Sequence, residues 1–289
     1  EAMGMTAVPV ENSGAAAGRI AAGAFKYAVL LLFTAVALVP FVWMVSSSLK
    51  TSTDVFTIPM RWIPRTVHLE NFAAIWEKVP LLAYFKNTTA VAIIVTLMQI
   101  ITSSFAAYAF AKMRFPGRDA LFLAYIGTIA VPWQVYMVPQ FIMMRGAGLY
   151  DTIWALVVLQ SFSAFGVFLM RQFYLGIPGE LSEAARIDGL SEYGIWLKII
   201  LPLSKPAIAT LAIFTFVNTW NDYMGPLIYL TTDLSKTIQV GLRRFIQAYS
   251  ADYNLIMAAS LCSLVPVTVV FLFLQRYFIE GIATTGLKG

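Results

Sequence analysis

The sequence predicts an all-α integral membrane protein with six transmembrane helices and a cytoplasmic helix–turn–helix loop between the fourth and the fifth. Of its 289 residues, 59% are hydrophobic and 12% are charged, which is about half the charged fraction of a soluble domain. Six windows are apolar over the roughly 20 residues that a helix needs to cross a bilayer. One polar segment that contains alanine and glycine, residues 175–205, separates the fourth window from the fifth.

The six windows form the predicted transmembrane region, residues 26–280, and together contain a single Asp, Glu, Lys or Arg, which is Asp222. Backbone groups facing lipid must be hydrogen-bonded within the segment, so the windows are predicted to be helices. The two-residue alternation of membrane β-strands is absent. The windows are residues 27–48, 87–111, 120–144, 152–170, 206–230 and 255–275.

The two ends of the chain are predicted to be tails on the cytoplasmic side. Residues 1–25 are rich in Ala and Gly and are expected to be a flexible N-terminal tail, and residues 281–289 form a short C-terminal tail. The loop KMRFPGR after the second window carries three basic residues, against one in RGAGLYD after the third. Basic loops stay in the cytoplasm, so this contrast places both termini inside, although the summed charges of all loops are too balanced to decide.

The composition also excludes several classes of protein. One cysteine and one histidine, His68, exclude a disulfide framework and a site with several histidine ligands, so no metal site is predicted. The net charge of +5 comes from scattered residues, which indicates contacts with loops and lipid headgroups and not with nucleic acid. The stretch GIATTGLK is the nearest approach to a phosphate-binding loop, but Leu287 precedes Lys288 and no Ser or Thr follows. No cofactor is therefore expected on this chain.

Residues 175–205 are predicted to form two short helices joined by a tight turn. Leu181, Ala184 and Ala185 share one helical face, with Ser182, Glu183 and Arg186 on the other side. Gly189 stands where a helix end requires a left-handed backbone, and Ser191 can cap a second helix. That helix is expected to end at Leu201–Pro202, before Pro206 opens the fifth span. From composition alone, this hairpin could lie on lipid or could receive a partner protein.

The same segment resembles the EAA loop of permease subunits of ABC importers. EAARIDG, followed nine residues later by IILP, matches the pattern EAA-x3-G-x9-I-x-LP at every fixed position. The stretches FPGRDALF, LYDTIWALVV, FLMRQFY and NTWNDYMGPLIYL are similar to those of maltose-type carbohydrate permeases, from about residue 27 to the C-terminus. The residues that the resemblance assigns to contact with an ATPase are Glu183, Ala184, Ala185, Arg186, Asp188, Gly189, Ile199, Leu201 and Pro202.

The resemblance also implies a function and a set of partners. Two permease chains, usually different ones, would form the pathway in the bacterial cytoplasmic membrane. Two ATPase subunits beneath them would bind ATP and Mg²⁺, and an extracytoplasmic binding protein would deliver a carbohydrate. A permease for a non-sugar solute and an ion-coupled secondary transporter are the alternatives, but a secondary transporter usually shows inverted repeats and several buried carboxylates, whereas the spans contain one Asp.

The fifth window contains the candidate solute contacts. Asn218, Asn221 and Asp222 share one helical face, and a carboxylate within a span is costly enough to indicate that it faces protein, water or solute. Trp220 and Tyr223 could add the aromatic surface that sugars stack on. These polar groups could instead hydrogen-bond neighbouring helices or cap a break near Gly225–Pro226. In the third window, Gln134 could contact solute or could pair with backbone groups freed by Pro132 and Pro139.

Overall fold

The computed structural model describes residues 13–246 and 252–286, and every regular element in these ranges is a helix. The predicted all-α class is therefore confirmed. Three helices are long and apolar enough to cross a membrane unbroken: α1 (Ser13–Ser48), α3 (Leu81–Lys112) and α14 (Tyr253–Gly286). Three bent pairs of helices bring the number to six if each pair is one span.

Bent pairs of helices form the third span, the fourth span and the entry to the fifth, and the sequence predicts a kink in the third. In the third, α4 (Arg118–Gly127) continues through η1 (Thr128–Ala130) and meets α5 (Trp133–Gly146) at 97°. In the fourth, α6 (Ile153–Gln160) meets α7 (Ala164–Leu175) at 41°. Before the fifth span, the segment Glu192–Leu203 meets α11 (Lys205–Trp220) at 79°, and α12 (Met224–Tyr229) follows α11.

The first break follows from proline chemistry. Two prolines in the third window predict a kink, because proline has no backbone N–H to donate. The chain breaks at Pro132, which precedes the first residue of α5, whereas Pro139 lies inside α5. The backbone of Val131 is extended (ψ 114°), the conformation that a residue before proline prefers.

The second break keeps its freed backbone groups hydrogen-bonded. The Gln99 side chain of α3 donates to the carbonyl of Gln160 at 2.7 Å, and the Thr102 hydroxyl donates to the carbonyl of Ser161 at 2.9 Å. The Ser163 hydroxyl accepts from the N–H of Gly166 at 3.0 Å and caps α7. Two carbonyl groups and one N–H group at this interruption thus have partners, as backbone groups within a membrane require.

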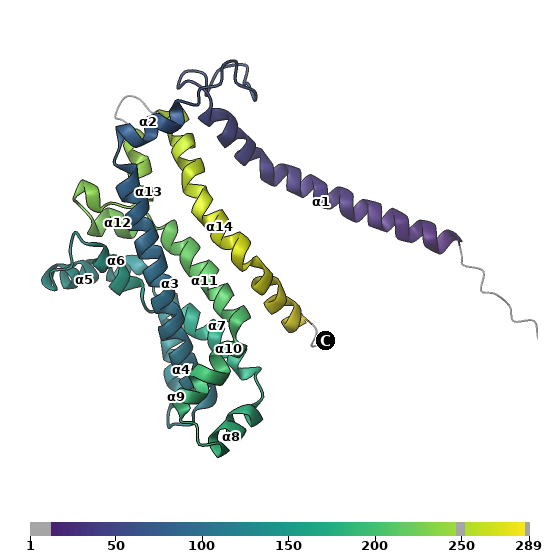
Figure 1. Cartoon of the computed structure of the whole chain (residues 1–289), viewed down its shortest axis with the longest axis vertical. Helices are drawn as coiled ribbons and strands as arrows, with labels where there is room; N and C mark the ends of the chain where they lie inside the picture. Colours follow the sequence, from purple (N-terminus) through teal and green to yellow (C-terminus); the bar gives the residue numbers. More distant parts are fainter. Residues whose placement is uncertain (1–12, 247–251, 287–289) are drawn as a thin grey trace, which may run out of the picture.

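The centre of the bundle is α3, which packs against both α7 and α11, while α14 lies against α11 and α1 (Figure 1). The helices α3 and α7 lie close together at Gly166, where an added Cβ would clash with the Ser103 hydroxyl. One buried cluster, with Met170, Tyr174 and Leu211, lies beside the loop of the helical hairpin. A second joins Tyr84 and Trp220 near the opposite end, which carries α2 (Asn71–Lys78) and α13 (Ile238–Leu242).

Helix α1 leaves the bundle at an angle, with only its C-terminal end near the other helices (Figure 1). None of its most apolar 18-residue window is buried. The helix also extends into the predicted flexible tail, because residues 13–25 are helical. Likewise, α14 continues through residues 281–286 of the predicted C-terminal tail. The remaining tail residues, 1–12 and 287–289, lie outside the described residues.

Candidate coupling loop and translocation face

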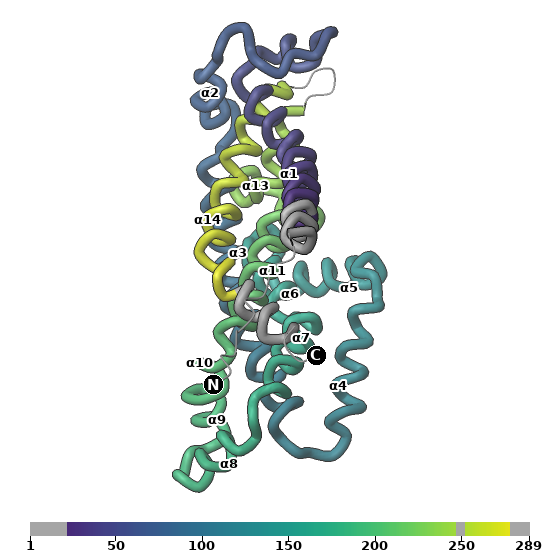
Figure 2. Tube along the Cα trace, turned by 90° about the vertical axis from the view of Figure 1, so that its right-hand side faces the viewer, coloured from purple at the N-terminus to yellow at the C-terminus, as the bar shows by residue number. Residues whose placement is uncertain are grey.

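The hairpin predicted between the fourth and fifth spans lies at one end of the molecule, with α8 (Gly179–Ile187) at its tip (Figures 1 and 2). Gly189 has φ +82°, the left-handed conformation predicted for it. The N–H of Leu190 donates to the carbonyl of Ala185, and the N–H of Gly189 donates to that of Arg186, both at 3.0 Å. This pair of bonds is a Schellman motif, which turns the chain sharply at the end of α8.

The buried side of α8 does not coincide with the face that the spacing predicts. Ser182 and Ala185 are buried, whereas Leu181 and Ala184, which were expected to share one helical face with Ala185, are exposed. Ile187 is 86% exposed. Because Ser182 has a smaller side chain than leucine, α8 can lie close to its neighbours at that position. Ala184 and Ile187 are therefore presented outward, and Glu183, Asp188 and Gly189 are exposed with them.

Arg186 contacts this chain's own carboxylate. Its guanidinium donates twice to Glu192, from Nε to Oε1 at 2.6 Å and from Nη2 to Oε2 at 3.3 Å. The Tyr108 hydroxyl of α3 donates to the same carboxylate at 2.6 Å. The hydrogen bonds from Arg186 and then from Tyr108 hold the pKa of Glu192 below its usual range. This network fixes the orientation of α8 relative to the second helix and to the bundle.

The second helix of the hairpin begins as predicted and ends later. The Ser191 hydroxyl accepts from the N–H of Gly194 at 3.2 Å, which confirms it as the cap. From Glu192 the chain continues through a π-helical turn, Trp196–Ile200 (η2), and passes Leu201–Pro202 without ending. The helix ends at Leu203, one residue beyond the predicted end at Leu201–Pro202. Ile199 and Leu201 are half-buried and Pro202 is exposed, so these motif residues form the base of the hairpin.

Of the predicted solute contacts, Asp222 is bonded within the protein. Its carboxylate accepts from the Gln160 side chain at 2.9 Å and from the N–H of Gly225 at 3.1 Å. It therefore both joins α6 and caps the break between α11 and α12, which are the two structural roles left open by the sequence. Gln160 in turn accepts from the Thr219 hydroxyl at 3.1 Å. This network fixes the wall of a cavity of about 320 Å³.

The other predicted solute residues are divided among different places. Asn218 is exposed and lines the 320 Å³ cavity together with Asp222. Asn221 accepts from Gln239 at 3.2 Å, and the half-buried Tyr223 hydroxyl accepts from Arg243 at 2.6 Å. Gln134 is exposed on α5 and does not line this cavity.

Trp220 is a correction to the predicted set. It is 1% exposed, packs against Phe216 and Phe85, and donates its indole N–H to the Ser263 hydroxyl at 3.2 Å. The aromatic side chains that line the cavity are instead Trp133, Tyr136 and Tyr229, with Gln140 and Gln160 as polar neighbours. Tyr229 lies in the fifth window, but Trp133, Tyr136, Gln140 and Gln160 come from α5 and α6, so no periodicity within the fifth span could find them.

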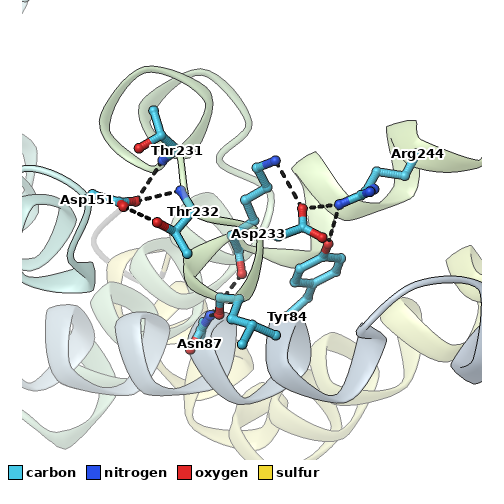
Figure 3. Close-up of polar contacts among 9 residues, drawn as sticks. Tyr84, Asn87, Asp151, Thr231, Thr232, Asp233 and Arg244 are labelled. Carbon is cyan, nitrogen blue, oxygen red and sulfur yellow. Dashed lines mark hydrogen bonds and ion pairs between the residues drawn. The ribbon is translucent and has the colours of Figure 1, made fainter.

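The end of the molecule opposite the hairpin carries a second polar network, shown in Figure 3. Asp151, before α6, accepts from the N–H groups of Thr231 and Thr232 at 2.7 and 2.9 Å and from the Thr232 hydroxyl. The hydrogen bond from the Thr232 side chain is the main reason that the pKa of Asp151 lies below its usual range. Asp233 pairs with Arg244, and Asn87 of α3 donates to the Leu234 carbonyl at 2.7 Å. These bonds hold the segment after α12 against α3 and α6.

Comparison with known proteins identifies sequence relatives of the whole chain. The model of a family described as the inner membrane component of binding-protein-dependent transport systems matches residues 99–284. An arabinooligosaccharide transport permease of Halalkalibacterium halodurans is 34% identical over 257 residues, covering 88% of this chain and 92% of the relative. An sn-glycerol-3-phosphate transport permease of Escherichia coli is also 34% identical, over 268 residues that cover 89% and 95% of the two chains.

A solved structure has the same fold. One chain of a bacterial ABC transporter involved in the import of the acidic polysaccharide alginate superimposes with a TM-score of 0.78. The alignment covers 94% of this chain and 100% of that one, at 23% sequence identity. The breaks and the hairpin described above thus belong to a fold that is found in a solved membrane transporter.

Proposed function

The chain belongs to the family of inner membrane components of binding-protein-dependent transport systems, and from this premise we propose that it forms half of the translocation pathway of an ATP-driven sugar importer. A second permease subunit, a different chain, supplies the other half. Two ATPase subunits bind ATP and Mg²⁺, and an extracytoplasmic binding protein delivers the solute. The termini and the hairpin are on the cytoplasmic side.

The observation that carries this proposal is the outward face of α8. Ala184 and Ile187 project from the tip of the hairpin, while Arg186 and Glu192 tie α8 back to α3 through Tyr108. A small and an apolar side chain on a braced helix suit insertion into a cleft on an ATPase. A displacement of α8 by that ATPase would be carried directly into the helix bundle. The hairpin is thus a two-state element that nucleotide and loaded binding protein can both bias.

The 320 Å³ cavity and helix α1 suggest where solute and the second permease bind. Asn218, Asp222 and Gln140 provide polar groups around the 320 Å³ cavity, and Trp133 and Tyr136 provide flat apolar surfaces. This combination suits a sugar, whose hydroxyl groups need planar hydrogen-bonding partners and whose ring faces stack on aromatic side chains. The gap between α1 and the bundle (Figure 1) is where we place contact with the second permease and lipid.

The solute class rests on the relatives. The arabinooligosaccharide permease favours a carbohydrate, and the glycerol-phosphate permease makes a non-sugar solute the second candidate. The two candidates differ in charge, because a phosphate ester is anionic whereas an oligosaccharide of arabinose is neutral. Stimulation of ATP hydrolysis by each solute, in the reconstituted complex with its binding protein, distinguishes them.

The test of ATPase docking is co-purification from solubilised membranes of the cells that make the protein. We expect the tagged chain to retain an ATPase, a second permease and, with solute present, a binding protein. Ala184→Arg should lose the ATPase, because a long charged side chain replaces a methyl group on the docking face. Leu234→Arg, an exposed position at the opposite end, is the matched control and should retain it. Retention of the ATPase by Ala184→Arg with uptake unchanged would refute the docking proposal.

A further inference from the structure

A second, larger cavity of about 770 Å³ lies beside the hairpin, between α8, the C-terminal end of α3 and the turn that leads to α4. Four cationic and two anionic side chains line it: Lys112, Arg114, Arg118 and Arg186, against Glu183 and Glu192. Glu183 and Arg186, which the resemblance assigns to ATPase contact, line the cavity, whereas Ala184 and Ile187 on the outward face of α8 do not. The cavity therefore adjoins the proposed docking face.

Three of the four cations have partners within the chain. Lys112 donates to the Ile177 carbonyl at 2.6 Å, Arg118 pairs with Asp119, and Arg186 pairs with Glu192. Among the described residues, Arg114 has no ion pair or hydrogen bond, and its side chain is exposed at the cavity. The Arg114 guanidinium therefore has all its N–H donors available, and the other three cations are held in place by their bonds within the chain.

Two further polar groups of α8 lie in the cavity wall: the Ser182 hydroxyl and the N-terminus of the helix. Ser182 is 2% exposed, and within the described residues its hydroxyl has no hydrogen-bond partner. A buried hydroxyl without a hydrogen-bond partner is costly, so its presence in a cavity wall indicates that a ligand could bond to it. Gly179 begins α8, and no side chain caps this helix end. The first N–H groups of a helix, together with its dipole, favour an anion.

From these observations we propose that the cavity binds a phosphate group. Arg114 would supply the unpaired positive charge, the Ser182 hydroxyl would donate to a phosphate oxygen, and the N-terminus of α8 would face the same group. The geometry favours phosphate over carboxylate because the donors occupy three positions on two elements, the turn after α3 and α8, and phosphate offers oxygens in several directions. A phosphate there would link α8 to the turn after α3, so its presence would stabilise the hairpin in one position.

The phosphate could belong to a lipid headgroup or could be free in solution. Met113 and Leu175 line the cavity and are 38% and 50% exposed, so apolar surface that could receive acyl chains adjoins the charged groups. Basic pockets between membrane helices on the cytoplasmic side are suited to anionic headgroups. The experiment therefore uses two probes, phosphatidylglycerol and inorganic phosphate, and compares each with the neutral-headgroup lipid phosphatidylcholine.

The test uses the full chain in detergent. Native mass spectrometry measures bound phosphatidylglycerol, and thermal unfolding measures stabilisation by inorganic phosphate. The variants are Arg114→Gln and Ser182→Ala, with Arg145→Gln on α5 as the control, because Arg145 is exposed and distant from the cavity lining. We expect affinity for one of the probes to fall about tenfold in Arg114→Gln, the loss typical of one charged hydrogen bond, and less in Ser182→Ala.

The outcomes are separable. Loss of phosphatidylglycerol binding in both cavity variants identifies a lipid site, and loss of stabilisation by inorganic phosphate identifies a soluble ligand; either supports the proposal. Binding that is equal in all three variants, or absent for both probes, overturns it. The unfolding temperature of each variant without a probe shows whether the variant is folded. Ser182→Ala removes an unpaired hydroxyl and should not lower this temperature. None of these readouts needs an ATPase or a sugar, so they are independent of the proposed transport function.

Discussion

Two turns in this molecule join an acidic residue to a glycine, and they are built in opposite ways. At the hairpin, the turn from Arg186 to Ser191 is closed by backbone bonds that span at most five residues. At the break after α11, Asp222 caps Gly225 locally but also accepts from Gln160, which lies 62 residues away. The first turn is determined by its own sequence, whereas the second depends on where α6 lies.

The two turns therefore respond differently to force. The hairpin turn can keep its shape when it moves, because its backbone hydrogen bonds join residues within the turn itself. The break between α11 and α12 changes only if α6 moves too, because the Asp222 carboxylate bridges them. A motion that starts at α8 therefore alters the cavity wall when it displaces α11 relative to α6. Four substitutions test whether the first turn is local and whether the second depends on α6.

The largest effect is expected for Gly225→Ala. An added Cβ would lie 2.5 Å from the Asp222 carboxylate oxygen Oδ2 and 3.4 Å from Leu156, so the carboxylate would have to leave its partners. We expect a loss of about 2–3 kcal/mol of folding stability, measured by thermal unfolding in detergent. Gly146→Ala, where nothing lies within 4 Å of the added Cβ, is the control. An equal, small effect of both would mean that Asp222 does not hold this break.

The next effect is expected for Gln160→Ala. It removes the donor to Asp222 and the acceptor for Thr219, so two half-buried or buried polar groups lose a partner. We expect about 1–2 kcal/mol less stability and slower uptake of solute, because Gln160 lines the cavity. Gln134→Ala, at an exposed position on α5, should change stability little. Stability as high as that of the wild type would show that the long-range bond is dispensable.

A smaller effect is expected for Gly189→Ala in the hairpin. Nothing lies within 4 Å of the added Cβ, so the cost comes only from the left-handed backbone at φ +82°. Such a conformation costs a residue with a Cβ about 1 kcal/mol, and asparagine should cost less. Thermal unfolding of the two variants, beside Gly179→Ala at the start of α8, measures this. A loss for alanine as large as that for Gly225→Ala would contradict the local character of the turn.

The smallest effect is expected from the exposed ion pair. The pKa of Glu192 lies below its ordinary value of 4.5 because of Arg186 and Tyr108. Its stabilisation is therefore present above that value and is lost as pH falls through the lowered pKa. Arg186→Gln should reduce stability at pH 7 by up to about 1 kcal/mol, and its difference from wild type should shrink as the medium becomes acidic. A difference that is constant with pH would exclude the Glu192 carboxylate as its cause.

The features that the sequence could predict are those set by neighbours along the chain. Gly189, Ser191 and the six apolar windows follow from residues within a few positions, and the structure has the left-handed glycine and the serine cap. The packed face of α8 could not be predicted, because a buried serine and an exposed leucine contradict a rule based on hydrophobicity alone. The burial of Ala185 in the cluster that contains Tyr108 and Ile195 decided it.

The cavity was predictable only in part. Asp222 stands out as the single charge in the six windows, and Asn218 lies beside it in the cavity. Trp220 has the right chemistry for a sugar but faces the core, because α11 directs it towards Phe85 and Ser263. Trp133, Tyr136 and Gln160 reach the cavity only because the third and fourth spans are broken, and the positions of those breaks depend on contacts between helices.

The π-helical turn Trp196–Ile200 has a consequence for the two ends of the segment that contains it. A turn with i→i+5 bonds holds one residue more than an α-helical turn. Residues after it are therefore rotated by about 100° relative to an unbroken α-helix. Deleting one residue there would restore an α-helical turn. It would rotate Ser191 and α8 by that angle about the axis of the segment Glu192–Leu203, relative to α11. The hairpin's facing direction thus depends on this residue count as well as on the side-chain bonds from Arg186 and Tyr108 to Glu192.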